Sequence, residues 1–132
     1  MNMIKKNGGF TLVELIVVIA ILAILAGVAV PAYSGYLNSA NEAADITQLS
    51  AIKTAAMATF ATEGTVTEIT VTAADGTISE ITVEHSGLGN GDTAPDVYGD
   101  DDFEAFYGST TYPTLKSDTY KDGATWTSEG WE

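Results

Sequence analysis

The sequence predicts an α+β protein in which a long N-terminal α-helix is packed by a small antiparallel β-sheet head. Three observations lead to this prediction. Residues 15–33 hold 17 apolar residues in 19. An apolar stripe with helical spacing continues to about residue 63, and a Thr-, Gly- and Asp-rich region with two near-identical segments follows it. We therefore expect four parts: a short N-terminal segment (1–9), an apolar helix (10–33), its amphipathic continuation (34–63) and a β-rich globular region (64–132).

The apolar segment is long enough to cross a membrane. As a helix its 19 residues span ~28 Å, close to the ~30 Å hydrocarbon core of a bilayer. Lys5 and Lys6 precede the segment. Because positive residues stay on the cytoplasmic side, we expect a single-pass chain whose C-terminus lies outside.

Two other kinds of N-terminal signal fit the residues less well. A secretory signal peptide ends in a small-residue cleavage site, and no strict Ala-x-Ala occurs between residues 20 and 40. Its apolar region would also not contain an acid such as Glu14. A plain signal anchor accounts for the span but leaves Glu14 and the Gly9–Phe10 junction unexplained.

The helix is expected to change character at Pro31. Pro31 lacks a backbone donor and crowds the preceding turn, so together with Gly27 it predicts a kink. Beyond it, apolar residues recur at spacings of three and four: Ala43, Ile46, Leu49, Ile52, Ala56 and Phe60. The charged residues of this part lie off that stripe: Glu42, Asp45, Lys53 and Glu63. We expect the helix to end near Gly64, which would cap it.

The β-rich region contains a predicted hairpin. Residues 67–71 (TEITV) and 79–83 (SEITV) alternate polar and apolar side chains on either side of an Ala-Asp-Gly sequence. We predict a three-residue loop with Gly76 left-handed, which sets Ile69 opposite Ile81. A two-residue loop would set Val71 against Glu80, so it is not expected. A second turn signal at residues 122–123 completes a sheet of three to five strands.

The composition excludes several functions. The chain has 132 residues, 18 acidic side chains against 5 lysines, no arginine and a net charge of -13. Such a chain is poorly suited to bind nucleic acid. No cysteine is present and there is one histidine, so disulfides, thiolate metal sites and multi-histidine sites are excluded. No Ser/His/Asp set or phosphate loop occurs, and we expect no enzyme. His85 is expected at the surface.

An acidic, glycine-rich stretch at residues 87–102 is the one candidate for a bound ion. Calcium prefers oxygen ligands, and the weak candidates are Asp92, Asp96, Asp100, Asp101 and Asp102. Their spacing does not match an EF-hand loop. A solvated acidic loop is the simpler interpretation, so neither a metal nor another cofactor is part of the main prediction.

The N-terminus resembles the processing site of type IV pilins and pseudopilins. Residues 9–14 have the sequence GFTLVE and run directly into the apolar segment. The resemblance implies that a prepilin peptidase cuts between Gly9 and Phe10, removes residues 1–9 as a leader peptide and methylates the new amine of Phe10. Glu14 matches the family's glutamate, and we expect it to form a charge pair with the Phe10 amine during assembly. Pro31 matches the family's proline in the membrane helix.

The same resemblance implies a structural role. The chain would be a pilin that waits in the cytoplasmic membrane and assembles into a surface filament, with residues 10–33 in the filament core. Its partners would be the membrane, the prepilin peptidase, the pilus assembly platform and copies of itself. Two alternatives remain open at this point: a type II secretion pseudopilin that forms a short piston, and a minor or tip pilin that acts as a binding module. After cleavage 3 lysines and 18 acidic side chains leave a charge of -15, which disfavours direct binding of nucleic acid.

Overall fold

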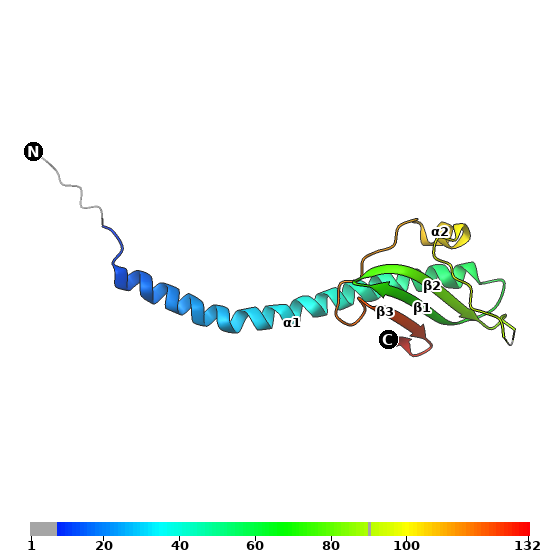
Figure 1. Cartoon of the computed structure of the whole chain (residues 1–132), viewed down its shortest axis with the longest axis horizontal. Coiled ribbons are helices and arrows are strands. Elements are labelled where there is room, and N and C mark those ends of the chain that lie inside the picture. Colours follow the sequence, from blue (N-terminus) through cyan, green and yellow to red (C-terminus); the bar gives the residue numbers. More distant parts are fainter. Residues whose placement is uncertain (1–7, 90) are drawn as a thin grey trace, which may run out of the picture. The chain divides into compact units, whose positions relative to one another are not determined.

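The computed structural model describes residues 8–89 and 91–132 and has the predicted α+β architecture (Figure 1). The elements follow the order α1 (Leu12–Thr59), β1 (Val66–Ala74), β2 (Thr77–His85), α2 (Asp101–Tyr107), β3 (Gly123–Thr127) and β4 (Gly130–Trp131). The four strands form one antiparallel sheet in the order β2-β1-β3-β4. The chain divides into two compact units, Met1–Tyr36 (the N-terminal unit) and Leu37–Glu132 (the globular unit). Lys5, Lys6 and most of the predicted leader lie outside the described residues.

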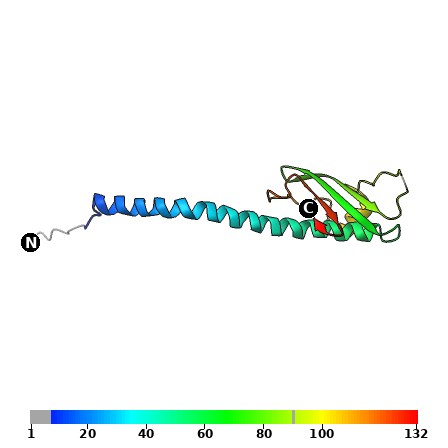
Figure 2. The same cartoon turned by 90° about the horizontal axis from the view of Figure 1, so that it is seen from below.

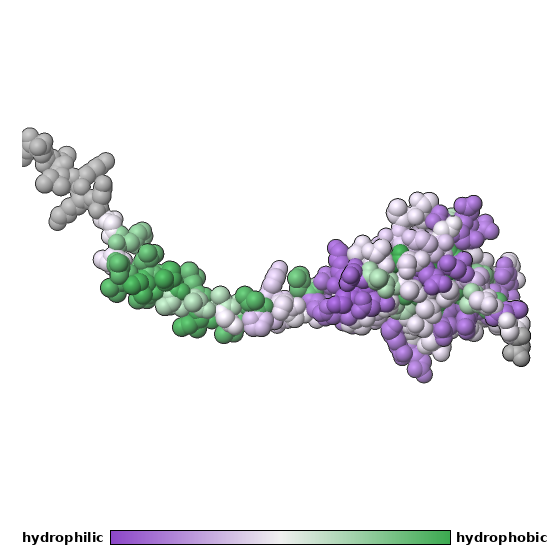
Figure 3. All heavy atoms as spheres, viewed as in Figure 1, coloured by the Kyte–Doolittle hydropathy of each residue, from purple (hydrophilic) through white to green (hydrophobic). Residues whose placement is uncertain are grey.

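The N-terminal unit exposes its apolar side chains. Large apolar residues of α1 before Tyr36 are half to three-quarters exposed, and Figure 3 shows a continuous hydrophobic surface there. The helix is unbroken at Pro31, whose carbonyl accepts the Ser34 hydroxyl at 2.9 Å. The kink predicted at Gly27 and Pro31 stays a prediction. Residues 8–36 of this unit leave the apolar surface uncovered, and an exposed apolar surface of this extent is typical of contact with lipid or with another protein.

The core of the globular unit lies between α1 and the sheet (Figure 2). Its largest members are fully buried: Leu49, Ile52, Ile69, Val71, Ile81, Val83, Phe103 and Leu115. The predicted helix stripe is confirmed at Leu49, Ile52, Ala56 and Phe60. It is wrong at Ala43 and Ile46, which are exposed. The buried position one turn before Leu49 is instead Asp45, which the sequence analysis placed off the stripe.

Asp45 is buried because the backbone of a distant loop satisfies its carboxylate. One oxygen accepts the Lys116 N–H at 3.0 Å, and the other accepts the N–H groups of Lys116 at 2.9 Å and Ser117 at 2.7 Å. Residues 116–119, which we name the clasp loop, contact two more polar side chains of α1. Asn38 Oδ1 accepts the Asp118 N–H at 3.0 Å, and Glu42 Oε2 accepts the Thr119 hydroxyl at 3.3 Å. A cysteine-free chain thereby joins segments more than 70 residues apart.

The register predicted for the first hairpin is wrong. The loop has two residues, Asp75 and Gly76, and both have a positive φ (47° and 83°). This geometry fits a type I′ turn, the tight turn that matches the twist of the strands. A Cβ on Gly76 would also collide with the Leu115 carbonyl, so only glycine fits there.

A β-bulge restores the apolar face that this two-residue loop would otherwise disrupt. The register shifts by one residue where β2 passes Ser79, between the Ala73–Ile78 and Thr72–Glu80 pairs. Val71 therefore lies opposite Ile81 rather than Glu80. The two-residue loop was not expected from the sequence, because an uninterrupted ladder after it would set Val71 against Glu80.

The C-terminal strands also differ in detail from the expectation. Thr119 and Tyr120 form a turn rather than a strand. β3 pairs with β1, with Trp126 opposite Ile69, and then turns back into β4. On the core side the Lys53 ammonium lies 5.3 Å from the centre of the Trp126 ring. The predicted count of three to five strands is confirmed.

We predict that Asp45→Asn destabilises the globular unit by about 2–4 kcal/mol, because an amide turns a donor toward backbone N–H groups that need an acceptor. Urea unfolding of the detergent-solubilised full chain, followed by tryptophan fluorescence, measures the change. Asp122→Asn is the matched control: Asp122 is exposed, so we expect a change within about 0.5 kcal/mol. Equal unfolding midpoints for the two variants would contradict the role given to Asp45.

Candidate processing and assembly site

The predicted cleavage site lies in non-helical backbone. Residues 8–11 precede α1, which begins at Leu12, and Phe10 is 93% exposed. A Cβ on Gly8 or Gly9 would meet nothing within 4 Å. Because a peptidase needs an accessible backbone, the exposure of this non-helical segment is compatible with cutting at the Gly9–Phe10 bond. The structure does not test cleavage itself, which stays a prediction.

A capping box fixes the start of α1. The Thr11 N–H donates to Glu14 Oε2 at 2.8 Å, and the Glu14 N–H donates to Thr11 Oγ1 at 3.2 Å. Each side chain thus satisfies a backbone donor that the first turn leaves unpaired. The sequence analysis missed this role, although the Thr-x-x-Glu spacing before an apolar run is its recognised signal. Glu14 therefore has a partner within its own chain before any other subunit is present.

Glu14 and Phe10 line the same apolar groove. The other lining residues are Val13, Leu15, Val17 and Val18, all on α1 or just before it. A groove formed by one helix turn closes only against another molecule. An ionised carboxylate in such surroundings costs on the order of 2.5–3.5 kcal/mol at the bilayer centre and less near the interface, so a cationic partner would stabilise it. The amine created at Phe10 would lie four residues before Glu14, just outside the start of α1.

The candidate calcium ligands are engaged mainly with backbone N–H groups. Asp92 Oδ2 accepts from Gly89 at 2.6 Å, and Asp96 Oδ1 accepts from Ile81 at 3.2 Å and Tyr98 at 3.0 Å. Within the described residues no three His, Asp or Glu side chains are grouped closely enough to hold a metal ion. Calcium binding stays untested.

The acidic stretch also contains a helix that the sequence analysis took for a loop. Asp100 caps α2, its Oδ1 accepting the N–H groups of Asp102 and Phe103 at 3.0 Å each. Asp101 and Asp102 occupy the first turn. Acidic side chains there interact favourably with the positive end of the helix dipole. Asp-rich sequence directly before an apolar residue was therefore a helix-start signal, not only a loop signal.

His85 is buried, which corrects the expectation of a surface residue. Its ring is stacked on Phe60 with centroids 4.8 Å apart, and 7% of the residue is exposed. Nδ1 accepts the Gly87 N–H at 3.2 Å, and Nε2 lies 3.7 Å from Glu63 Oε2. These contacts join the end of α1 to the end of β2. Gly64, the expected cap, has no positive φ; a Cβ there would instead approach the Gly87 nitrogen to 2.7 Å.

An acidic cavity of about 650 Å³ lies beside His85. Its walls come from the end of α1, the end of β2 and the loop that leads into α2. The charged residues among its lining are Glu63, Asp92, Asp96, Asp100 and Asp102. The structure thus brings four of the five calcium candidates to one cavity, and Asp101 lies outside its lining.

Comparison with known proteins identifies the N-terminal signal. Residues 4–30 match the family model described as the prokaryotic N-terminal methylation motif. No curated protein and no solved structure matches the chain significantly. Among the described residues α1 is the helix long and apolar enough to cross a membrane. The motif and this helix fit a membrane-anchored precursor, processing by a prepilin peptidase and assembly into a multi-subunit filament. The chain therefore carries the prepilin-type signal shared by type IV pilins and pseudopilins, and the motif points to a structural protein rather than an enzyme.

Proposed function

We propose that this protein is the structural subunit of a type IV pilus. The observation that carries the proposal is the exposed apolar surface of the first half of α1, which the methylation motif of residues 4–30 overlaps. Lipid covers this surface in the precursor, and the same surfaces of neighbouring subunits cover it in the filament. A helix that must leave the membrane and pack on copies of itself has to remain apolar on every side.

Each residue of the signal has a place in this sequence of events. The peptidase cuts the exposed Gly9–Phe10 bond and methylates the Phe10 amine. A methylated secondary amine remains basic, so the amine still carries a positive charge near neutral pH. The Glu14 carboxylate of an adjoining subunit forms an ion pair with this amine. The pair favours one axial register between the two subunits over slipped registers. The assembly platform extracts the processed subunit, and the globular unit comes to lie on the outside of the cell-surface filament.

A pseudopilin would share the signal and the exposed helix, so a pilin is distinguished from a pseudopilin by the structure into which the subunits assemble. Long filaments on cells that consist mainly of this chain support the pilus. A short structure with failed secretion in a deletion strain supports a pseudopilin, and a trace component at filament ends supports a tip pilin.

We predict that the protein in sheared filaments begins at N-methyl-Phe10. Intact-mass analysis should show the loss of residues 1–9 and the gain of one methyl group. The same spectrum reports whether this chain is the main component. A mature chain that still begins at Met1, or that begins near Ala32, would remove the proposal, because either start is incompatible with the cut at Gly9.

We predict that Glu14 acts in assembly through its charge. Glu14→Ala and Glu14→Gln should both insert and be cut after Gly9, and in both the globular unit should unfold as in wild type. Filaments in strains with either variant as the sole subunit should fall at least tenfold, because an unpaired charge is left in an apolar core. Co-expression with wild type should restore incorporation, since both variants still offer the amine.

The glutamine variant separates the charge pair from the capping box. Glutamine at this position still completes a capping box, whereas alanine removes it. Normal filaments with Glu14→Gln and few with Glu14→Ala would show that Glu14 acts by fixing the helix start. Normal filaments with both variants would leave Glu14 without a role in assembly.

A further inference from the structure

Among the described residues of the globular unit, Lys116 is the lysine whose ammonium has no acidic or aromatic partner. The unit contains three lysines. The Lys53 ammonium is held over the Trp126 ring, and the Lys121 ammonium bonds to Asp118 at 3.1 Å, an interaction that raises the pKa of Lys121. Lys116 is exposed, and across residues 8–89 and 91–132 its ammonium makes no ion pair.

The backbone of Lys116 is nevertheless fixed. Its N–H donates to both oxygens of the buried Asp45. These bonds hold the backbone of Lys116, in the clasp loop, beside Asp45 of α1. The Lys116 side chain takes no part in this contact. A substitution of Lys116 can therefore change the charge of this end of the globular unit without removing the bonds that hold the clasp loop.

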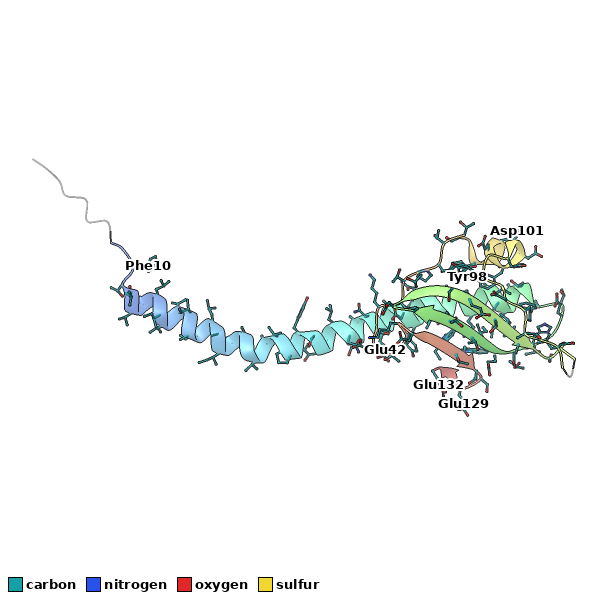
Figure 4. All side chains as sticks on the ribbon, viewed as in Figure 1. Phe10, Glu42, Tyr98, Asp101, Glu129 and Glu132 are labelled. Atoms are coloured by element: carbon teal, nitrogen blue, oxygen red, sulfur yellow. The ribbon has the colours of Figure 1, made fainter. Side chains whose placement is uncertain are left out.

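The acidic cavity lies at the other end of the same unit. Thr59, the last residue of α1, lines the cavity, whereas the clasp loop is held at Asp45. Fourteen residues of α1 separate Asp45 from Thr59, which places these two positions ~21 Å apart along the helix axis. Figure 4 shows Glu42, beside the clasp loop, well apart from Asp101 on α2.

The residues that line the cavity include five acids and neither lysine nor arginine. Residues 86–115 contain no lysine or arginine. In three of the five acids that line the cavity, one carboxylate oxygen accepts backbone N–H groups and the other oxygen makes no such bond: Asp92, Asp96 and Asp100. The Glu63 side chain is 60% exposed. Cavity carboxylates can thus accept an ammonium group from outside.

We propose that Lys116 of one subunit binds in the acidic cavity of a neighbouring copy of this chain. The proposal rests on the pilus function given above. In a helical filament every copy has the same orientation, so one end of a globular unit meets the other end of the next in a head-to-tail contact that does not close. With a net charge of -15 per mature chain, most contacts between neighbours are repulsive. When two neighbouring subunits are positioned so that Lys116 of one meets the carboxylates of the other's cavity, the contact is attractive.

Zero-length carbodiimide cross-linking of wild-type filaments tests the contact directly. This reagent joins an ammonium to a carboxylate only where the two already touch. We expect a cross-link between Lys116 and Glu63, found by mass spectrometry in dimers and higher multimers. Because the end of α1 at Thr59 lies ~21 Å along the helix from Asp45, where the clasp loop is held, a link from Lys116 to Glu63 can form only between copies. Cross-links of Lys116 to other carboxylates alone, or none, would overturn the contact.

Charge reversal gives a second measure that does not depend on the reagent. Lys116→Glu should reduce the yield of sheared filaments about tenfold relative to the cell-associated subunit, and Lys116→Arg should leave it unchanged. Adding Glu63→Lys to Lys116→Glu should restore the yield. Wild-type filaments with an unchanged Lys116→Glu yield would overturn the contact alone, whereas an absence of wild-type filaments would overturn the pilus function and the contact with it.

Discussion

The first half of α1 exposes its apolar side chains throughout the described part of the N-terminal unit, and this exposure is the constraint on which the rest of the account depends. Its large apolar side chains remain at least half exposed from Leu12 to Tyr36. Burial of such side chains contributes ~1.5–3 kcal/mol each, so a helix of this kind is held firmly by any apolar surroundings it finds. The processing site before the helix and Glu14 in its first turn matter because, in our proposal, they determine whether lipid or neighbouring subunits surround the helix. Glu14 is the one acidic or basic side chain in residues 12–36, and its capping box satisfies it while no other subunit is present.

The globular unit solves a different problem, which is to remain folded with a small core and no disulfide. The hydrogen bonds of Asp45 link the clasp loop to α1 across 71 residues of sequence, as a disulfide could in a chain with cysteines. Hydrogen bonds to a charged acceptor contribute about 1.5–3 kcal/mol each, comparable with the 2–4 kcal/mol typical of a disulfide. The stacked pair of Phe60 and His85 closes the opposite end of the unit. Polar contacts thus anchor both ends of the sheet on the helix, and the apolar core fills the space between them.

The features that sequence patterns predicted are those with a local cause. The apolar run, the helical spacing of Leu49, Ile52 and Ala56, and the alternation of the two hairpin segments each follow from side-chain periodicity alone. The proposed cleavage site likewise needs no tertiary information. These features place the helix, the hairpin and the N-terminal signal correctly.

The features that were missed depend on residues distant in sequence. Asp45 looks like a solvent-facing acid until the clasp loop supplies its donors, and His85 looks exposed until Phe60 stacks on it. The hairpin register depends on a bulge at Ser79, and the cost of that bulge is offset only when Ile81 gains a place in the core. The helix α2 was recognisable, since Asp100 precedes an apolar residue by the spacing of a cap, but the density of acids suggested a loop.

Chemical labelling of a single cysteine tests the central claim that neighbouring subunits cover the apolar helix. The chain has no cysteine, so each variant reports one position. Ala23→Cys lies on the exposed apolar surface of α1, and Ser128→Cys lies in the exposed turn before β4. In intact sheared filaments a water-soluble maleimide should label Ser128→Cys and leave Ala23→Cys unlabelled, and detergent dissolution should make Ala23→Cys reactive. Equal labelling of both positions in intact filaments would contradict the account, because the helix would then not be the buried element of the assembly.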